Sequence, residues 1–140
     1  MTLRPFHLAV TVDDLTAAQH FYGETLGCAR GRSDAHWTDY DFFGHQLVVH
    51  LDPEKLPAAA YNPVDGHDVP VPHFGVVLTM PDWQALTARL RVANTSFIIA
   101  PTVRFAGQAG EQATMFFRDP AGNALEFKAF ADDAMLFATD

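Results

Sequence analysis

The chain has 140 residues and a formal net charge of −8, and 49% of its residues are hydrophobic against 19% charged. This composition is typical of one globular domain with a full core. Lys and Arg form no cluster, which argues against nucleic acid or an anionic membrane as a partner. The single cysteine, Cys28, excludes an intrachain disulfide and a cysteine-based zinc site. Because no long apolar run occurs, we expect a soluble, cytoplasmic protein.

The first half predicts a strand, a helix and three further strands. Apolar and β-branched residues at Phe6–Val12 indicate the first strand. Asp13 or Asp14 is suited to cap a helix whose apolar residues recur at helical spacing as far as Leu26, and Gly27 is suited to end it. This half is module one, about residues 5–51, and its remaining strands are expected at Ala29–Ser33, Trp37–Phe43 and Gln46–Leu51.

Residues 52–72 break this pattern. Five of the nine prolines lie in this stretch. Proline interrupts helices and removes a donor from sheet ladders. We therefore expect a connector that is partly helical at most and contains no strand.

The second half repeats the order of the first. A strand at His73–Leu78 and a helix marked by apolar residues from Trp83 to Ala93 are followed by strands at Phe97–Phe105, Gln112–Arg118 and Asn123–Phe130. This half is module two, residues 73–130. The loop between its first two later strands, residues 105–111, is either a lid or an ordinary surface loop. The tail, residues 131–140, predicts a short helix through Met135, Leu136 and Phe137.

The two halves together predict one domain, residues 1–140, of the α+β class, built from two βαβββ modules. An internal repeat of this length is too long for a solenoid and favours two modules that share one site. The alternative is an unrelated α+β domain whose halves match by chance.

The stretch Asp119–Phe127 reads as a tight turn that leads into a strand. The two-residue period of a strand places Ala124, Glu126 and Lys128 on one face and Leu125, Phe127 and Ala129 on the other. A carboxylate in such a strand is costly to bury unless a cation or a hydrogen-bond donor meets it. Glu126 is therefore a candidate functional residue.

Four residues near equivalent positions of the repeat suggest a metal site. His7 and His73 open the first strands of the two modules, while Glu126 and His50 lie in the last strands. Two histidines and one carboxylate can hold Fe, Mn, Co, Ni or Zn and leave coordination positions open. A histidine taken alone at a strand start is more often a surface or core residue than a metal ligand, and His45 competes with His50 for any role in that hairpin.

Three stretches of the chain resemble motifs of the vicinal oxygen chelate superfamily. They are His7-Leu8-Ala9-Val10, Phe21-Tyr22-x-x-x-Leu26-Gly27, and Asp119-Pro120-x-Gly122-Asn123-x-Leu125-Glu126. This superfamily includes glyoxalase I, extradiol dioxygenases, fosfomycin-resistance transferases and bleomycin-resistance proteins. The resemblance spans about residues 5–130. It implies a curved, incomplete barrel around a divalent metal, a small-molecule substrate and a homodimer.

The resemblance also implies roles for single residues. His7, His73 and Glu126 match the metal positions, and His50 matches a fourth ligand position where the family usually has Glu. Glu126 is the best candidate for a catalytic base, with His50 or His45 to handle protons in an oxygenase. The implied function is a divalent-metal-dependent enzyme, either a glyoxalase-like lyase or isomerase or an extradiol-type dioxygenase, acting on a substrate with vicinal oxygens.

The alternative is a non-catalytic protein that binds a small molecule, as bleomycin-resistance proteins do. Those members lack the metal residues, so the presence of His7, His73 and Glu126 argues against that branch. The departure at His50 weakens the isomerase assignment, because a carboxylate at that position commonly shares the work of metal binding and of the base.

Overall fold

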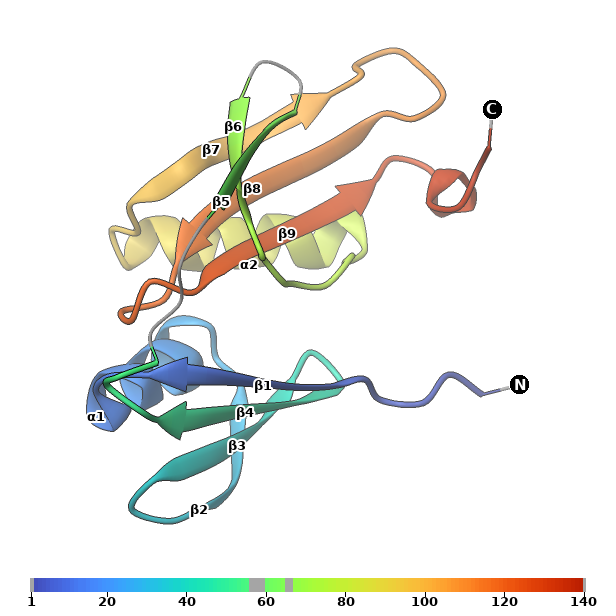
Figure 1. Cartoon of the computed structure of the whole chain (residues 1–140). Coiled ribbons are helices and arrows are strands. Elements are labelled where there is room, and N and C mark those ends of the chain that lie inside the picture. Colours follow the sequence, from blue (N-terminus) through green and yellow to red (C-terminus); the bar gives the residue numbers. More distant parts are fainter. Residues whose placement is uncertain (1, 56–59, 65–66, 140) are drawn as a thin grey trace. The chain divides into compact units, whose positions relative to one another are not determined.

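The computed structural model describes residues 2–55, 60–64 and 67–139. The chain divides into two compact units, residues 1–58 with 119–123 and residues 59–118 with 124–140. Helices and open sheets are both present, and no described sheet closes into a barrel (Figure 1). The predicted α+β class is therefore confirmed.

Unit one contains a four-stranded sheet in the order β1-β4-β3-β2. Its strands are β1 (His7–Val12), β2 (Ala29–Ser33), β3 (Trp37–Phe42) and β4 (His45–Leu51), at the predicted places. β1 pairs in parallel with β4, and the other pairs are antiparallel. One face of this sheet is buried through Val12, Tyr40, Leu47 and Val49. Because side chains alternate along a strand, His7, Gln46 and His50 lie on the opposite, more exposed face.

The helix of unit one begins as α1 (Leu15–Gln19) and continues as a π-helix, η1 (His20–Thr25). The Asp14 carboxylate caps it by accepting from the Ala17 N–H at 3.0 Å. Gly27, with φ of 77°, supplies the left-handed residue after the helix, as predicted. The wide π turn was not foreseen, and within it Phe21 and Tyr22 are both buried with their rings edge to face.

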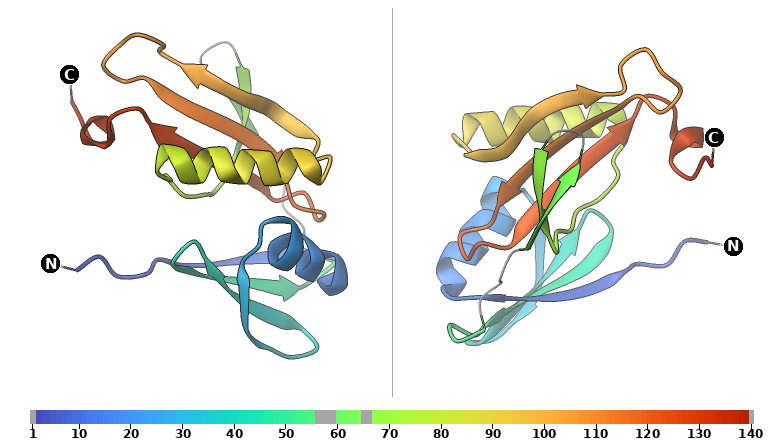
Figure 2. Two further views of the ribbon diagram at one scale, coloured as in Figure 1. Left: turned by 180° about the vertical axis from the view of Figure 1, so that it is seen from behind. Right: turned by 45° about the horizontal axis from the view of Figure 1, so that its top comes forward.

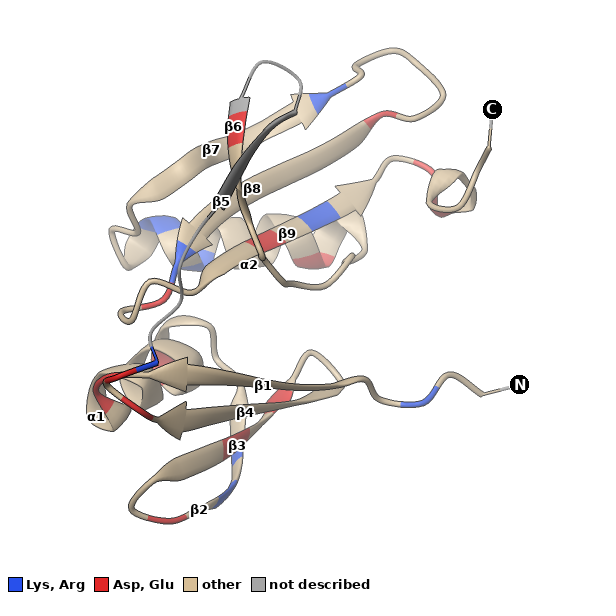
Figure 3. Ribbon diagram, in the orientation of Figure 1, with Lys and Arg blue, Asp and Glu red and all other residues tan. Residues whose placement is uncertain are grey.

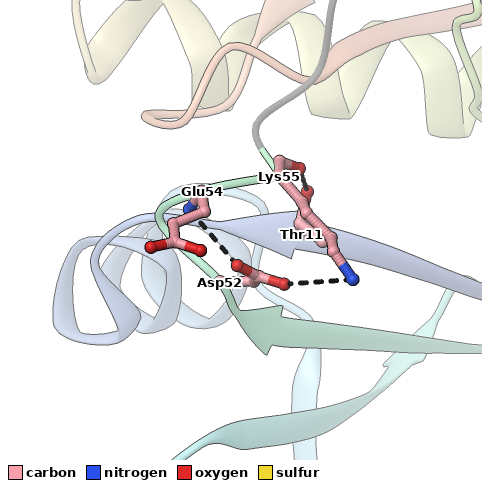
Figure 4. A network of polar contacts seen from close by, with 4 residues as sticks. All are labelled: Thr11, Asp52, Glu54 and Lys55. Carbon is pink, nitrogen blue, oxygen red and sulfur yellow. Dashed lines mark hydrogen bonds and ion pairs between the residues drawn. The ribbon is translucent and has the colours of Figure 1, made fainter.

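The chain segment that follows β4 is hydrogen-bonded to the end of β1 (Figure 4). The Thr11 hydroxyl donates to the Lys55 carbonyl. The Asp52 carboxylate accepts from the Glu54 N–H at 3.2 Å and lies 3.9 Å from the Lys55 ammonium. The Lys55 side chain is 79% exposed, so the ion pair itself contributes little and the backbone contacts define the turn.

Unit two contains a three-stranded antiparallel sheet in the order β7-β8-β9. Its elements are α2 (Met80–Val92), β7 (Phe97–Arg104), β8 (Gln112–Arg118) and β9 (Ala124–Phe130). Helix α2 lies across one face of the sheet, where the Trp83 indole N–H donates to the Phe127 carbonyl at 2.9 Å (Figure 2). The predicted alternation in β9 is confirmed, because three side chains are fully buried: Leu125, Phe127 and Ala129.

The predicted strand at His73–Leu78 is wrong as a continuous element. The segment runs parallel to β9 but forms only isolated bridges, Phe74 to Leu125 and Val77 to Lys128. Between them Gly75 approaches β9 so closely that a Cβ there would lie 1.5 Å from the Glu126 carbonyl oxygen. This close approach interrupts the regular ladder and explains why glycine stands at position 75.

The prediction that residues 52–72 contain no strand is also wrong. β5 (Ala60–Val64) and β6 (His67–Val71) form an antiparallel two-stranded hairpin. Such a hairpin has open outer edges, where the missing N–H of a proline removes no ladder bond. Val69 packs against Ile99 and Phe116, so the hairpin covers part of the sheet face opposite α2 (Figure 1). Residues 56–59 of the connector lie outside the described residues.

The tail forms a 3₁₀ helix, η2 (Asp133–Met135), which confirms a short helix that ends earlier than expected. The Asp132 carboxylate caps it by accepting from the Ala134 N–H at 3.0 Å. In the described parts of the chain, Lys and Arg are scattered among Asp and Glu and form no stripe (Figure 3). No helix in those same ranges has the length and apolar character needed to cross a membrane.

Candidate metal site

In unit two, Glu126 meets one histidine and one hydroxyl group. Strand β9 directs its side chain, which is 11% exposed, to the sheet face opposite α2. The Nε2 atom of His73 lies 3.3 Å from Oε1 of Glu126. The Thr114 hydroxyl, from the neighbouring strand β8, donates to Oε2 at 2.6 Å. Oε2 therefore has a hydrogen-bond donor, and Oε1 faces the imidazole of His73.

The imidazole of His73 is fixed by a backbone carbonyl. Its Nδ1 lies 2.7 Å from the oxygen of Pro70, and its ring packs edge to face on Phe116 with centroids 5.0 Å apart. A carbonyl oxygen only accepts, so Nδ1 carries a proton and Nε2 of the neutral ring keeps its lone pair toward Glu126. A lone pair and a carboxylate at this distance repel, which favours a proton or a divalent cation between them. Metal-binding histidines usually show this tethering of the other ring nitrogen.

His7 in unit one shows the same tethering. Its Nδ1 lies 2.9 Å from the amide oxygen of Gln46, the residue directly opposite in the parallel pair of β1 and β4. The amide oxygen only accepts, so Nε2 of His7 is again the nitrogen left for a ligand. The first histidines of the two modules therefore present equivalent nitrogens.

His50 lies well apart from His7 within unit one. The strand register pairs His7 with Gln46 and His50 with Thr11. Four residues along a strand correspond to about 13 Å. His50 is exposed on the same face as His7 but at the other end of the strand pair. One metal ion cannot bind both of these histidines in this unit as it stands.

The register also revises the repeat argument that led to His50. In unit two, Glu126 pairs with Gly75, two residues beyond His73, as the flanking bridges show. The same step from His7 in unit one leads to Ala9, whose partner is Val48. The counterpart of Glu126 is therefore Val48, and the offset argument misses this position by two residues.

His45 is engaged with the backbone. Its Nδ1 accepts from the Phe6 N–H at 2.8 Å, and strand alternation directs it away from the face that carries Gln46. Its role therefore differs from that of His7, whose Nδ1 donates.

Of the four predicted site residues, the structure brings together His73 and Glu126. His7 and His50 belong to unit one, and the other two belong to unit two. Within residues 2–55, 60–64 and 67–139, no three His, Cys, Asp or Glu side chains are grouped closely enough to hold a metal ion. The full ligand set therefore stays a prediction.

Two polar neighbours, Thr114 and Gln46, were not predicted from the sequence. Thr114 faces Lys128 across β8 and β9 on the Glu126 side of the sheet, where Lys128 was expected, and Gln46 faces His7. Counting back from the tight turn that joins β8 to β9 would have found Thr114. No local signal reveals Gln46, because the offset of a parallel pair is not set by a turn.

A buried hydrogen-bond network holds the turn that precedes β9. The Tyr22 hydroxyl donates to Oδ2 of Asp119 at 2.7 Å, and Oδ1 accepts from the N–H groups of Ala121 and Asn123. The Asn123 amide also donates to the Thr11 carbonyl at 2.9 Å. Burial, and next the Asp119 charge, raise the pKa of the Tyr22 phenol well above its usual value. This turn belongs to unit one, although β9 belongs to unit two.

The elements described define an α+β protein made of two small open-sheet units, with a polar His–Glu pair on one sheet face. The chain belongs to the Glyoxalase/Bleomycin resistance protein/Dioxygenase superfamily, whose family model matches residues 4–127. The predicted membership is thereby confirmed. A comparison with curated proteins gives no match.

One solved structure whose name matches this superfamily supports the assignment, and two others share the fold. The chain is similar to a glyoxalase/bleomycin resistance protein/dioxygenase from Alicyclobacillus acidocaldarius, with 33% identity, a TM-score of 0.79, and 95% and 96% of the two chains covered. It also resembles the fosfomycin resistance protein FosX from Listeria monocytogenes, with 16% identity, a TM-score of 0.70, and coverage of 97% and 100%. A lactoylglutathione lyase from Agrobacterium tumefaciens has 20% identity, a TM-score of 0.62, and coverage of 91% and 92%. The last two likenesses show the fold alone.

Proposed function

We propose that this protein is a divalent-metal-dependent enzyme that acts on a small substrate with two neighbouring oxygens. The reaction is that of a glyoxalase-like lyase or isomerase, or of an extradiol-type dioxygenase. The observation that carries the proposal is the His73–Glu126 pair, in which a tethered imidazole faces a carboxylate at 3.3 Å. Membership of a superfamily whose name includes glyoxalases and dioxygenases supports it.

The residues fit a divalent cation. His7 and His73 each have Nδ1 held by an oxygen acceptor, and Glu126 has one oxygen held by Thr114. Two imidazole nitrogens and one carboxylate suit Fe, Ni, Zn, Mn or Co. When bound, such an ion supplies open coordination positions and stabilises negative charge that develops on substrate oxygens. His50 is not proposed as a ligand of the same ion, because the strand register places it about 13 Å from His7.

The chain's own groups suggest how a substrate is held. Thr114 fixes one oxygen of Glu126, so the other is directed toward His73 and is the proposed catalytic base. Lys128 lies two residues further along the same face of β9, about 7 Å away, and forms no ion pair with a carboxylate in the described ranges. A cation at this place favours substrates with anionic oxygens. His50 is the proposed proton carrier, because an imidazole can both accept and donate a proton.

Metal content tests the proposal. Purified wild type, His73→Ala and Glu126→Gln would be compared by elemental analysis after reconstitution with each of the five metals. The matched control is His36→Ala, which removes an exposed histidine that precedes β3. We expect about one ion per chain in the wild type and the control, and loss in both site variants. Failure of the folded wild type to bind any of these metals would refute the enzyme proposal and leave small-molecule sequestration. Preference for Fe would direct assays to catechol cleavage, and preference for Ni or Zn to hemithioacetal isomerisation.

We further propose that the protein is a homodimer in which His7 of one copy joins His73 and Glu126 of the other. The test mixes His7→Ala and His73→Ala protein after unfolding and refolding them together. Random pairing of the two variants would restore roughly a quarter of the wild-type metal sites, because half of the dimers are mixed and each has one intact site. Each variant refolded alone is the control. No recovery on mixing would contradict a shared site.

A further inference from the structure

A hollow of about 480 Å³ lies on unit two, away from the His73–Glu126 pair. It is lined by the loop that joins β7 to β8, by the adjoining ends of β8 and β9, and by the C-terminal tail. Its lining includes Phe105, Ala109, Gln112, Phe130 and Leu136. Its volume is within the range of small-molecule pockets in proteins.

The hollow continues the sheet face that carries Glu126. Gln112 pairs with Phe130 across β8 and β9, and the pairs that follow on the same face are Thr114 with Lys128 and Phe116 with Glu126. Phe130 is four residues from Glu126 along one strand, which corresponds to about 13 Å. A molecule about 13 Å long therefore spans the distance from Glu126 to the hollow.

The lining of the hollow is uncharged. It combines two phenylalanine rings, one thioether and small aliphatic groups with the amides of Gln108 and Gln112. Two cations lie beside the lining: the Arg104 guanidinium is 5.2 Å from the ring centroid of Phe105, and the Lys128 ammonium is 5.9 Å from that of Phe130. The lining itself carries no charge, and its rings and aliphatic groups favour an uncharged aromatic or alkyl group.

We propose that this hollow binds the uncharged, apolar end of the substrate, while the vicinal oxygens lie at the His73–Glu126 pair about 13 Å away. The inference rests on the proposed function and narrows it to substrates with an aryl or alkyl tail. Small polar compounds without a tail are then poor substrates.

The hollow is tested by itself with N-phenyl-1-naphthylamine, an uncharged probe whose fluorescence rises in apolar surroundings. Leu136→Gln makes the lining polar, and Ala109→Trp fills the hollow from an exposed loop position. The matched control is Phe137→Gln, which changes a side chain that is 89% exposed and does not line the hollow. We expect saturable binding to the wild type, an affinity at least about fivefold weaker in both lining variants, and no change in the control.

The link to the metal site is tested with catechol and 4-alkylcatechols as chelating probes of increasing length on the metal-loaded protein. Tails that reach the hollow should tighten binding at least about tenfold over catechol, and Leu136→Gln should abolish that gain. Glu126→Gln should keep naphthylamine binding. Equal probe affinity in the wild type and the lining variants, or loss of probe binding as the protein dimerises, would overturn the subsite. Probe binding in a protein that takes up no metal would contradict the proposed function instead.

Discussion

Removal of the Tyr22 hydroxyl is the sharpest test of the buried network that holds the turn before β9. Tyr22 is fully buried and donates at 2.7 Å to Asp119, which is 4% exposed. A hydrogen bond to a charged acceptor contributes about 1.5–3 kcal/mol. Asp119 keeps three donors from Ala121 and Asn123, so the lower end of that range applies. Tyr22→Phe should therefore lower the free energy of unfolding by about 2 kcal/mol.

The measurement is urea unfolding followed by near-ultraviolet circular dichroism. With an m-value of about 2 kcal/mol/M, the midpoint should fall by roughly 1 M at unchanged slope. The matched control is Tyr40→Phe. Tyr40 is 2% exposed, and its hydroxyl has no hydrogen-bond partner by geometry among the described residues. Burial raises the pKa of the Tyr40 phenol, and the nearby Arg30 guanidinium offsets part of that rise.

Tyr40→Phe removes a desolvated hydroxyl whose polar neighbour, Arg30, is an exposed residue that water can solvate, so the free energy of unfolding should stay within about 0.5 kcal/mol of the wild type or rise. Equal losses in the two variants would show that the loss in Tyr22→Phe does not come from the hydrogen bond to Asp119. A Tyr22→Phe midpoint that matches the wild type would show that the Asp119 network does not stabilise the fold.

Because the pKa of Tyr22 is raised in the folded protein, the unfolded chain loses the phenol proton at a lower pH than the folded chain does. The free energy of unfolding should therefore fall as pH rises above about 10, and the urea midpoint should decline less steeply with pH in Tyr22→Phe. Gly75→Ala would bring a Cβ to 1.5 Å from the Glu126 carbonyl oxygen and should cost more than about 2 kcal/mol of unfolding free energy, whereas Gly110→Ala, with open space around it, should be neutral. Thr114→Val removes the hydroxyl that fixes Glu126 and should weaken metal binding about 10- to 100-fold by calorimetric titration; unchanged affinity would exclude a positioning role.

The sequence by itself determined the elements whose signals are local. Strand alternation correctly placed Leu125 and Phe127 in the core and Glu126 on the other face, because the two-residue period depends only on backbone geometry. The caps at Asp14 and Gly27 were likewise visible, since a short carboxylate and a residue free to adopt positive φ act within one turn. The superfamily motif was recognisable for the same reason.

The tertiary structure alone decided which groups meet the candidate ligands. Pro70 supplies the carbonyl oxygen that holds His73. It lies in the β5–β6 hairpin, which the sequence did not predict because the segment is rich in proline. The parallel register of β1 with β4, which no turn sets, brings Gln46 to His7 and makes Val48 the counterpart of Glu126 in place of His50. These contacts join residues far apart in the chain. They form because whole sheets bury apolar side chains and pair their backbone hydrogen bonds. No local pattern encodes that choice, so the sequence predicted candidate ligands but not the groups that orient them.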